Sequence, residues 1–344
     1  MAQRVGVQEL ERWAAGLLYP EQTSLKGDLV PLAGDASSRR YFRLILEAKS
    51  YVLTHAPPPS RENEVFVRRQ ALLSGAGVRV PVVYGSDSER GLLLQEDLGD
   101  CLLLSKLETD TADHLYAAAL DLLFRLQSLE AEKLLPPYSA DVLNEELQRF
   151  PSWFVEGLLG QSLDDEIRDL FDELTERLVN SALEQPRVAV HRDFHSRNLM
   201  CLPDGELAVI DFQDAVWGPV TYDLVSLTKD CYRRWPAASV KRWALEYRTR
   251  LLNTGFEGLP DESGFLRWMD WMGLQRHLKV LGTFARLALR DEKTAYLDDL
   301  PLVVAYCQET LASYPEEPAF TSCLDWFDDQ LLPAMRAHEW GRML

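Results

Sequence analysis

Residues 187–224 read RVAVHRDFHSRNLMCLPDGELAVIDFQDAVWGPVTYDL, and this stretch decides the fold. Two short apolar runs, Val188–Val190 and Leu207–Ile210, each end directly in a cluster of polar side chains. Pro203-Asp204-Gly205 between them has the composition of a turn. We therefore expect a β-hairpin-like pair of strands with acids at the strand ends.

The polar residues that follow these runs have a fixed spacing. The pattern H-x-D-x-x-x-x-N holds at His191, Asp193 and Asn198, and Asp211 opens a D-F pair thirteen positions later. This spacing resembles the catalytic loop and metal-binding aspartate of protein-kinase-like phosphotransferases. In that interpretation Asp193 accepts the proton of the acceptor hydroxyl. Asn198 and Asp211 hold the Mg²⁺ that bridges the phosphates of ATP.

Two other interpretations of the same residues stay open. One is a polar turn whose buried acids are satisfied locally. The other is a zinc-dependent hydrolase in which His191, Asp193 and His195 bind the metal. The sequence has no second histidine cluster to complete such a zinc site.

Composition restricts the class of protein. The chain has 344 residues, of which 47% are hydrophobic, and this is ample for a large core in two lobes. A formal charge of −18 argues against nucleic acid or an anionic membrane surface as a partner. The five cysteines are scattered without C-x-x-C pairs, and no apolar run is long enough to span a membrane. We expect a cytoplasmic protein with reduced thiols.

The first part of the chain alternates between helical and strand patterns. It predicts helices at 7–18 and 61–74, and strands at 29–32, 40–46, 51–54, 80–84 and 92–96. The turn before the second strand contains Gly34, Ser37, Ser38 and Arg39, which either cover the ATP phosphates or form an ordinary hairpin turn. Gln95, Glu96 and Leu98 read as a hinge whose backbone binds the adenine edge.

The remainder is mostly helical in pattern. It predicts helices at 115–129, 143–159, 167–183, 240–252, 264–290, 302–314 and 323–340. The expected fold is α+β: a bilobal protein-kinase-like fold with a small antiparallel-sheet N-lobe at residues 1–97. A larger, mainly helical C-lobe follows at residues 98–344 and carries the catalytic loop, the metal site and the substrate pocket.

The two motifs together resemble the aminoglycoside phosphotransferase family of small-molecule kinases. The second motif of that family, I-D-x-x-D-A-x-x-G-x-x-x-Y-D-L, is matched here by Asp211, Asp214, Gly218, Tyr222 and Asp223. Further blocks resemble the anomeric N-acetylmuramate/N-acetylglucosamine kinases of bacterial cell-wall recycling: Gly34–Tyr41, residues 55–58, 95–99, Gln275–Arg286 and Tyr296–Pro301. The resemblance implies an enzyme that transfers phosphate from ATP, with Mg²⁺, to the C1 hydroxyl of an N-acetylated amino sugar. We expect a monomer.

The same resemblance suggests roles for further residues. His191 and Arg192 would brace the catalytic loop, and Asp223 would pair with the loop backbone or with Arg192. The residues expected to contact the sugar are Asp193, His195, Arg197, Asp214 and Arg276. Asp214 could instead occupy a second metal position. The Arg276 guanidinium suits the lactyl carboxylate of N-acetylmuramate, although a solvated basic face near a helix end is the alternative. Core packing is expected of Trp268 and Trp271.

One feature departs from the protein-kinase pattern. The strand at residues 51–55 has no lysine to reach the ATP phosphates, and Lys49 precedes it. Arg39 or Arg40 would then hold the phosphates together with backbone amides and Mg²⁺. The departure leaves an inactive nucleotide-binding pseudokinase open. A kinase for another hydroxylated metabolite of the aminoglycoside, choline or homoserine type is a second rival, because a cationic acceptor calls for acids around its pocket and the sequence offers Glu145, Glu146 and Asp270.

Overall fold

A computed structural model describes residues 6–19, 27–32, 39–46, 49–57 and 59–342. Its contacts divide the chain into two compact units. The sheet unit comprises Met1–Leu126 and Arg197–Ala215, and the helical unit comprises Gln127–Ser196 and Val216–Leu344. The expected boundary at residues 97/98 differs from this division, because residues 98–126 and 197–215 group with the sheet unit. The lobe boundary itself stays a prediction.

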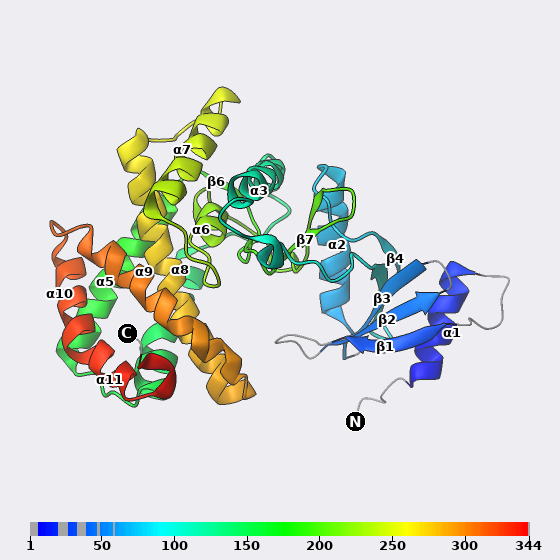
Figure 1. Ribbon diagram of the computed structural model, residues 1–344, viewed down its shortest axis with the longest axis horizontal. Helices are drawn as coiled ribbons and strands as arrows, with labels where there is room; N and C mark the ends of the chain where they lie inside the picture. The colour runs from blue at the N-terminus through cyan, green and yellow to red at the C-terminus, as the bar shows by residue number, and fades with distance from the viewer. Residues whose placement is uncertain (1–5, 20–26, 33–38, 47–48, 58, 343–344) are drawn as a thin grey trace. The chain divides into compact units, whose positions relative to one another are not determined.

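An antiparallel sheet forms the body of the sheet unit (Figure 1). Its strands lie in the order β1-β2-β3-β5-β4, with bounds Asp28–Leu32 (β1), Arg40–Leu46 (β2), Lys49–His55 (β3), Leu92–Glu96 (β5) and Val83–Asp87 (β4). Alternation along β2 buries Phe42, Leu44 and Leu46 and exposes Ile45. Helix α1 (Val7–Leu18) packs Leu10 against this buried face. The small antiparallel sheet expected from the sequence is confirmed.

Helix α2 (Arg61–Gly75) connects the sheet to the second motif. The Ser60 hydroxyl caps its N-terminus by accepting from the Asn63 N–H at 3.2 Å. Phe66 on the buried side of α2 packs against Phe212, with ring centroids 4.7 Å apart. Phe212 follows Asp211 directly, so this contact anchors the backbone beside that aspartate. The unit also contains α3 (Ala112–Gln127), which lies in it up to Leu126, and the 3₁₀ turn Leu103–Lys106.

The expected pairing of the two apolar runs is wrong. Strand β6 (Arg187–Val190) pairs with β9 (Val216–Pro219), and β8 (Leu207–Val209) pairs with β7 (Leu199–Cys201). Leu199–Cys201 is a third apolar run, and only the turn at residues 202–206 separates it from β8. The polar loop at residues 191–198 lies between β6 and these two strands. The tight turn at Gly205, with φ 89°, closes the β7–β8 hairpin.

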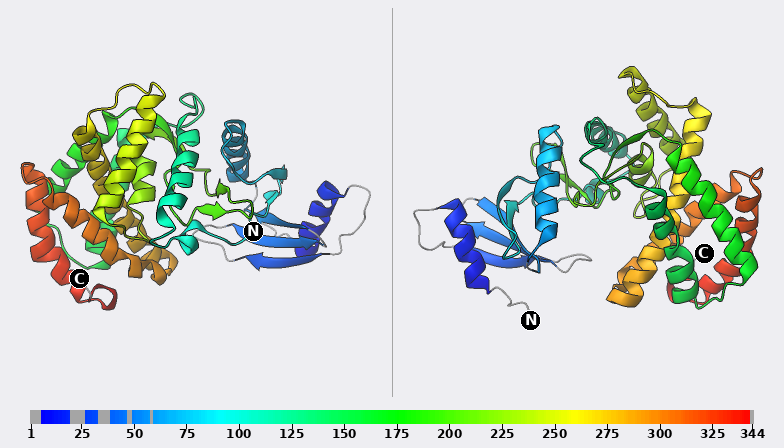
Figure 2. Two further views of the ribbon diagram at one scale, coloured as in Figure 1. Left: turned by 45° about the horizontal axis from the view of Figure 1, so that its top comes forward. Right: turned by 180° about the vertical axis from the view of Figure 1, so that it is seen from behind.

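Helices make up most of the helical unit (Figures 1 and 2). Their bounds are Ala140–Leu147 (α4), Asp165–Leu183 (α5), Tyr222–Thr228 (α6), Ala237–Asn253 (α7), Glu262–Asp291 (α8), Leu300–Ala312 (α9), Pro318–Trp326 (α10) and Leu332–Arg336 (α11). The 30-residue α8 runs through the core and is buried over most of its length. A Cβ atom at Gly282 would lie 2.2 Å from the Arg149 carbonyl carbon, so only glycine permits this close approach.

Most predicted elements differ from the structure by one to three residues at their ends, and three are broken or displaced at a proline. The helix expected at 143–159 is α4 followed by the π-helical segment Phe150–Leu158. The helix expected at 323–340 divides into α10, a π-helical turn Phe327–Leu331, α11 and the 3₁₀ turn Glu339–Gly341. Pro151 and Pro333 lack an N–H and so disturb regular helix at these places. Pro81 likewise cannot donate to a sheet, and the strand expected at 80–84 begins at Val83.

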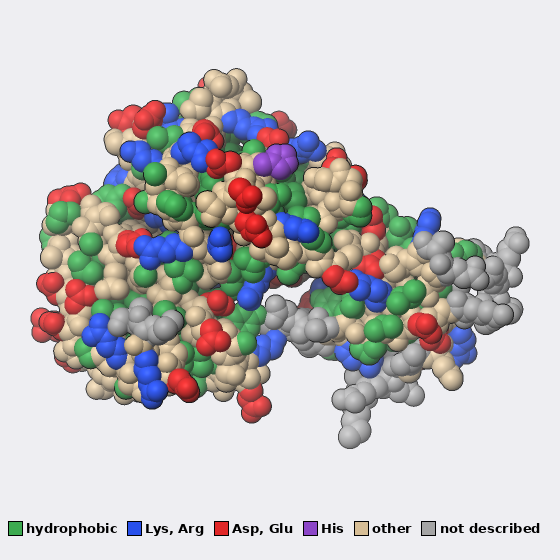
Figure 3. All heavy atoms as spheres, in the orientation of Figure 1, with side chains coloured by type: hydrophobic (Ala, Val, Ile, Leu, Met, Phe, Trp, Pro, Cys, Tyr) green, Lys and Arg blue, Asp and Glu red, His purple; other side chains and the backbone are tan. Residues whose placement is uncertain are grey.

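Charged side chains cover the drawn face of the helical unit with both signs interspersed (Figure 3). Several charged side chains of this unit form ion pairs, such as Arg177 with Glu317 at 2.7 Å and Arg267 with Glu184 at 3.3 Å. No helix within the described ranges is long and apolar enough to cross a membrane.

Candidate functional site

The loop after β6 carries the first motif in the helical unit. Arg192 has a left-handed backbone with φ 78°, which turns the chain sharply in front of Asp193. The carboxylate of Asp223, fully buried at the start of α6, accepts from the N–H groups of His191 at 2.6 Å and Arg192 at 3.0 Å. Burial raises the pKa of Asp223 to about 6, against the opposing effect of these hydrogen bonds. The contact with the loop backbone expected of Asp223 is therefore present.

Asp193 is half-buried at the turn of this loop. Its N–H meets Nδ1 of His191 at 3.2 Å, and its carbonyl oxygen accepts from the His195 N–H at 3.0 Å. Burial favours the neutral acid, but charge interactions, that with Lys279 the largest and those with His195, Arg276 and His191 after it, outweigh burial and lower the pKa of Asp193 to about 2. The carboxylate is thus ionised at neutral pH and can accept a hydrogen bond from a hydroxyl.

A buried ion-pair network lies behind the loop. Glu146 of α4 is 0% exposed and contacts the Arg192 guanidinium and the Tyr138 hydroxyl. The Lys279 ammonium of α8 lies 3.2 Å from Glu146 Oε1 and donates to the Tyr222 hydroxyl at 2.9 Å. The sequence interpretation named Glu146 only as an acid for a cationic acceptor. Its place between Leu143 and Leu147, on the apolar face of the helix, was the available signal of burial.

The far end of the loop is fixed to the segment after α6. Asp230 accepts from the Ser196 N–H at 2.9 Å and from the Ser196 hydroxyl, and also from the Tyr232 N–H at 3.0 Å. The His195 ring meets the edge of Tyr232 at 5.3 Å between centroids. Burial lowers the pKa of His195, and its Nδ1 has no hydrogen-bond partner in the described part of the chain.

Arg276 lies in the middle of α8 and is 2% exposed. The alternative of a solvated basic face near a helix end is therefore wrong, and Gln275, His277 and Lys279 are buried with it. Arg276 Nη1 donates to Cys231 Sγ at 3.4 Å, while its Nε has no hydrogen-bond partner among the residues described. Because a buried guanidinium is costly without an anionic or polar partner, this side chain is suited to hold a ligand group.

The tryptophans of α8 belong to the core, as predicted. Trp271 packs on Phe320 at 4.8 Å between ring centroids, and Trp268 donates to Glu184 at 2.9 Å. Both side chains are buried.

The second motif lies in the sheet unit. The Ile210 N–H donates to the Asn198 carbonyl at 3.1 Å, and this bond joins the backbone beside Asn198 to that beside Asp211. Asp211 has a left-handed backbone with φ 64° and is exposed. Gln213 stands where protein kinases have the glycine of their D-F-G motif. Its side-chain amide donates to Asp211 Oδ1 at 2.7 Å. A carboxylate and a side-chain amide offer the oxygen ligands that Mg²⁺ prefers, so the donor set fits this ion.

The remaining acid and arginine of the motifs also lie in this unit. Asp214 is exposed and interacts electrostatically with Arg69 of α2, and Arg197 is half-buried. The zinc interpretation of His191, Asp193 and His195 finds no support. Within the described ranges, no group of three or more His, Cys, Asp or Glu side chains is placed to hold a metal ion.

Three of the expected nucleotide-binding residues, Gly34, Ser37 and Ser38, lie outside the described residues. Arg39 is buried, and its Nε lies 3.1 Å from Glu62 of α2. Arg40 meets Nδ1 of His55 at 3.1 Å. Lys49 does not precede the third strand but begins β3, at an exposed position. No lysine lies further along β3, so the departure from the protein-kinase pattern remains.

The hinge residues lie at the end of β5. Gln95, Glu96 and Leu98 are each half-buried. Glu96 is engaged by Arg79 through two hydrogen bonds, of 2.5 and 2.8 Å, which hold its pKa below the usual range. Beyond the strand, Arg43 binds Asp97 at 2.7 Å and also Asp100, so the segment is tied back to β2.

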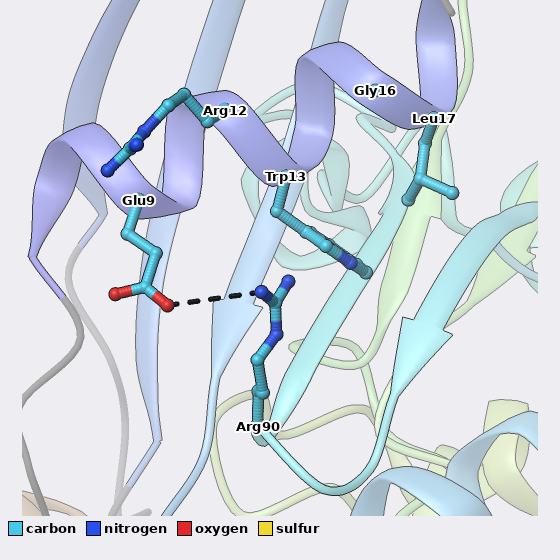
Figure 4. A pocket seen from close by; sticks show the side chains of 6 residues that line it. All are labelled: Glu9, Arg12, Trp13, Gly16, Leu17 and Arg90. Atoms are coloured by element: carbon cyan, nitrogen blue, oxygen red, sulfur yellow. Dashed lines mark ion pairs between the residues drawn. The ribbon is translucent and has the colours of Figure 1, made fainter.

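A hollow of about 480 Å³ lies elsewhere in the sheet unit (Figure 4). Its lining comes from α1 and from the turn before β5, with Trp13 as its largest apolar side chain. Glu9 and Arg90 face each other across it at 3.9 Å. None of the motif residues lines this hollow.

Solved structures of the same fold are kinases of small molecules. An ethanolamine kinase from Plasmodium vivax has a TM-score of 0.64 and 13% identity, covering 90% of this chain and 87% of that one. A choline kinase from Streptococcus pneumoniae has a TM-score of 0.57 and 16% identity, covering 88% of this chain and 98% of that one. The protein thus has the protein-kinase-like fold that the sequence predicted.

The chain belongs to the phosphotransferase enzyme family, whose pattern it matches over residues 28–263. It is 42% identical over 316 residues to the N-acetylmuramate/N-acetylglucosamine kinase of Pseudomonas aeruginosa, covering 90% of this chain and 93% of that protein. The kinase of the same name from Neisseria meningitidis is 35% identical over 330 residues, covering 94% and 97%. The family resemblance and the enzyme class predicted from the two motifs are confirmed.

Proposed function

We propose that this phosphotransferase uses ATP to phosphorylate the anomeric hydroxyl of N-acetylmuramate, N-acetylglucosamine or both, giving the sugar α-1-phosphate in peptidoglycan recycling. The relatives of that name, similar along almost the whole chain, support the substrate class. The observation that carries the chemistry is the ionised Asp193 on a loop held by Asp223.

Asp193 would accept the proton of the C1 hydroxyl as the sugar oxygen attacks the γ-phosphorus of ATP and ADP leaves. An anomeric hydroxyl is more acidic than other sugar hydroxyls. A carboxylate of low basicity that mainly orients the hydroxyl is therefore sufficient. Positioning of this kind supplies most of the catalysis in phosphoryl transfer.

Asn198 and Asp211 would hold Mg²⁺, which neutralises charge on the ATP phosphates when it is bound. Asp193 and Asn198 are five residues apart. A fully extended chain would separate their Cα atoms by no more than about 18 Å. The chain between them thus limits how far apart the proposed proton acceptor and this proposed metal ligand can lie.

The three acids that could have bound a cationic acceptor are each paired with a basic side chain. Glu146 is paired with Arg192 and Lys279, and Asp270 lies 2.7 Å from the Lys229 ammonium. Glu145 lies 3.3 Å from Arg149. Neutralised carboxylates attract a cationic choline or aminoglycoside weakly, and this favours a neutral or anionic sugar.

We further propose that Arg276 binds the lactyl carboxylate of N-acetylmuramate. Its buried guanidinium has an Nε without a hydrogen-bond partner in the described ranges, and a planar guanidinium matches a carboxylate. His195, whose Nδ1 is also without such a partner, would contact the same sugar.

An acceptor panel tests the proposed function. ADP release is measured with Mg·ATP and N-acetylmuramate, N-acetylglucosamine, choline, homoserine or kanamycin. The proposal predicts turnover with the amino sugars at least 100-fold above the others. Turnover with choline or kanamycin instead would show that the acceptor is not one of the two N-acetylated sugars. ATP binding without turnover on any acceptor of the panel would favour the pseudokinase alternative.

A further inference from the structure

Glu146 occupies an unusual position for an acid. Its side chain is 1% exposed, and both of its oxygens are engaged. Oε1 meets the Arg192 guanidinium and the Lys279 ammonium, and Oε2 accepts from Tyr138 and, at 3.5 Å, from Gln275. These charges keep the pKa of Glu146 below its usual range although burial opposes them. Glu146 is therefore a permanent buried anion.

The contacts around Glu146 bring together more positive than negative charge. Glu146 contributes one negative charge, whereas Arg192 and Lys279 contribute two positive ones. Because buried charge is unfavourable without a counter-charge, the negative charge of Asp193 is favoured beside this network, to which the buried Arg276 adds a further positive charge. Lys279 is the largest of the charge interactions that favour the ionised Asp193.

The network also fixes the backbone in front of Asp193. The Arg192 side chain reaches Glu146 and lies over the Tyr138 ring, 5.5 Å from its centroid. This anchor helps hold the left-handed turn at Arg192, which an L-residue with a side chain adopts at a cost. The direction in which Asp193 leaves the loop thus depends on Glu146.

We propose that Glu146 and Lys279 are a positioning pair for phosphoryl transfer: Glu146 holds Arg192 and Lys279 together, and this network fixes the turn from which the Asp193 carboxylate meets the acceptor hydroxyl. This rests on the proposed function, in which Asp193 receives the hydroxyl proton. Both residues act through Asp193 and not on the substrate.

The variants separate positioning from simple packing. Lys279→Met removes the charge at similar length, Lys279→Arg keeps it, and Tyr222→Phe removes only the hydroxyl that accepts from Lys279. Glu146→Gln keeps the shape of the anion. Glu145→Gln is the matched control, because the preceding side chain on the same helix is 77% exposed.

Kinetics with the preferred sugar give the first readout. We expect kcat to fall about 100-fold in Lys279→Met and Glu146→Gln, because small displacements of a reacting group have effects of this size. The KM for ATP should stay within threefold. Lys279→Arg should recover at least tenfold over Lys279→Met, Tyr222→Phe should lose about fivefold, and Glu145→Gln should match the wild type.

The second readout is the NMR titration of the Asp193 carboxyl carbon in wild type and Lys279→Met, and it needs no turnover. Lys279 and Arg276 of α8, His191 and His195 of the loop, and Asp223 of α6 all act on Asp193. Loss of Lys279 removes the largest charge interaction that favours the ionised carboxylate, so Asp193 should titrate at higher pH than in the wild type. The plot of log kcat against pH should then fall at its acid end in Lys279→Met.

The outcomes separate the two proposals. A folded Lys279→Met with kcat within threefold of the wild type and no change in the Asp193 titration overturns the positioning pair. If Lys279→Met or Glu146→Gln does not fold, unchanged kcat in Tyr222→Phe overturns it. A wild type that is inactive on both amino sugars but transfers phosphate to another acceptor, with the Asp193 titration and the kcat of the variants changed as expected, refutes the proposed sugar substrate and supports the positioning pair.

Discussion

The carboxylate of Asp223 accepts hydrogen bonds from two successive backbone N–H groups, those of His191 at 2.6 Å and Arg192 at 3.0 Å. One side chain at the start of α6 thereby sets the path of a loop more than 30 positions earlier in the chain. The Y-D-L ending of the second motif and the H-R-D of the first are thus parts of one structure.

Asp223→Asn should reduce both activity and stability. The amide presents only one oxygen to the two N–H groups, so about 1–3 kcal/mol should be lost from the free energy of unfolding at pH 4.5. We expect kcat to fall about 100-fold because the loop in front of Asp193 moves. Urea denaturation and steady-state kinetics measure the two effects, with Asp204→Asn in the exposed turn as the control.

The stability gap between wild type and Asp223→Asn should depend on pH. The folded pKa of about 6 lies above an unfolded value of about 3.9, which corresponds to about 3 kcal/mol. An acid with a raised folded pKa stabilises the fold below its unfolded pKa, and this contribution is lost as pH rises through 6. The gap should therefore narrow between pH 4.5 and 7. A stability gap that widens between pH 4.5 and 7 would contradict the raised pKa of Asp223.

Removal of the divalent cation should abolish turnover. With EDTA, ADP formation should fall to background, and Mg²⁺ should restore it. Asp211→Asn should raise the Mg²⁺ concentration for half-maximal activity at least about tenfold, because the amide lacks the charge of the ligand. Magnesium titration of the variant beside Asp204→Asn measures this effect, and equal requirements in both variants would remove Asp211 from the site.

Arg276 should discriminate between the two sugars. Arg276→Met should raise the KM for N-acetylmuramate about 10- to 100-fold, the value of a charge-assisted hydrogen bond, and change the KM for N-acetylglucosamine less than threefold. Arg276→Lys should recover part of the loss. A parallel rise in both KM values would assign Arg276 to the packing of α8 instead.

Gly282 should be intolerant of alanine. In most helices this change adds about 1 kcal/mol of stability, but here the new Cβ would meet the Arg149 carbonyl carbon at 2.2 Å. We expect a loss of about 1–3 kcal/mol through overpacking. Gly16→Ala in α1 is the control, since nothing lies within 4 Å of its Cβ position. Thermal denaturation of the two variants should give changes of opposite sign.

Local patterns predicted the elements that a single periodicity defines. The bounds of α1, β2 and β5 coincide with the expected ranges, because their apolar residues repeat at a helical or strand period. The polar spacing of His191, Asp193, Asn198 and Asp211 likewise indicated the family before any fold was known.

Such local patterns do not predict which strands or side chains pair when they lie far apart in the sequence. The partner of β6 is β9, some 25 residues later, and no local signal distinguishes it from the nearer apolar run at Leu207–Val209. Glu146 and Lys279 were missed as a pair because they are more than 130 positions apart in the sequence. Buried ion pairs depend on tertiary contacts that propensity does not contain.

The anomeric chemistry is tested most directly by ³¹P NMR of the protein with Mg·ATP and N-acetylmuramate or N-acetylglucosamine, beside Asp193→Asn. We predict a new phosphomonoester signal coupled to the anomeric proton in the wild type. In Asp193→Asn its rate should be reduced about 100- to 10,000-fold, while ATP binding is retained. A phosphomonoester signal coupled to a different sugar proton, or undiminished transfer by Asp193→Asn, would contradict the proposal.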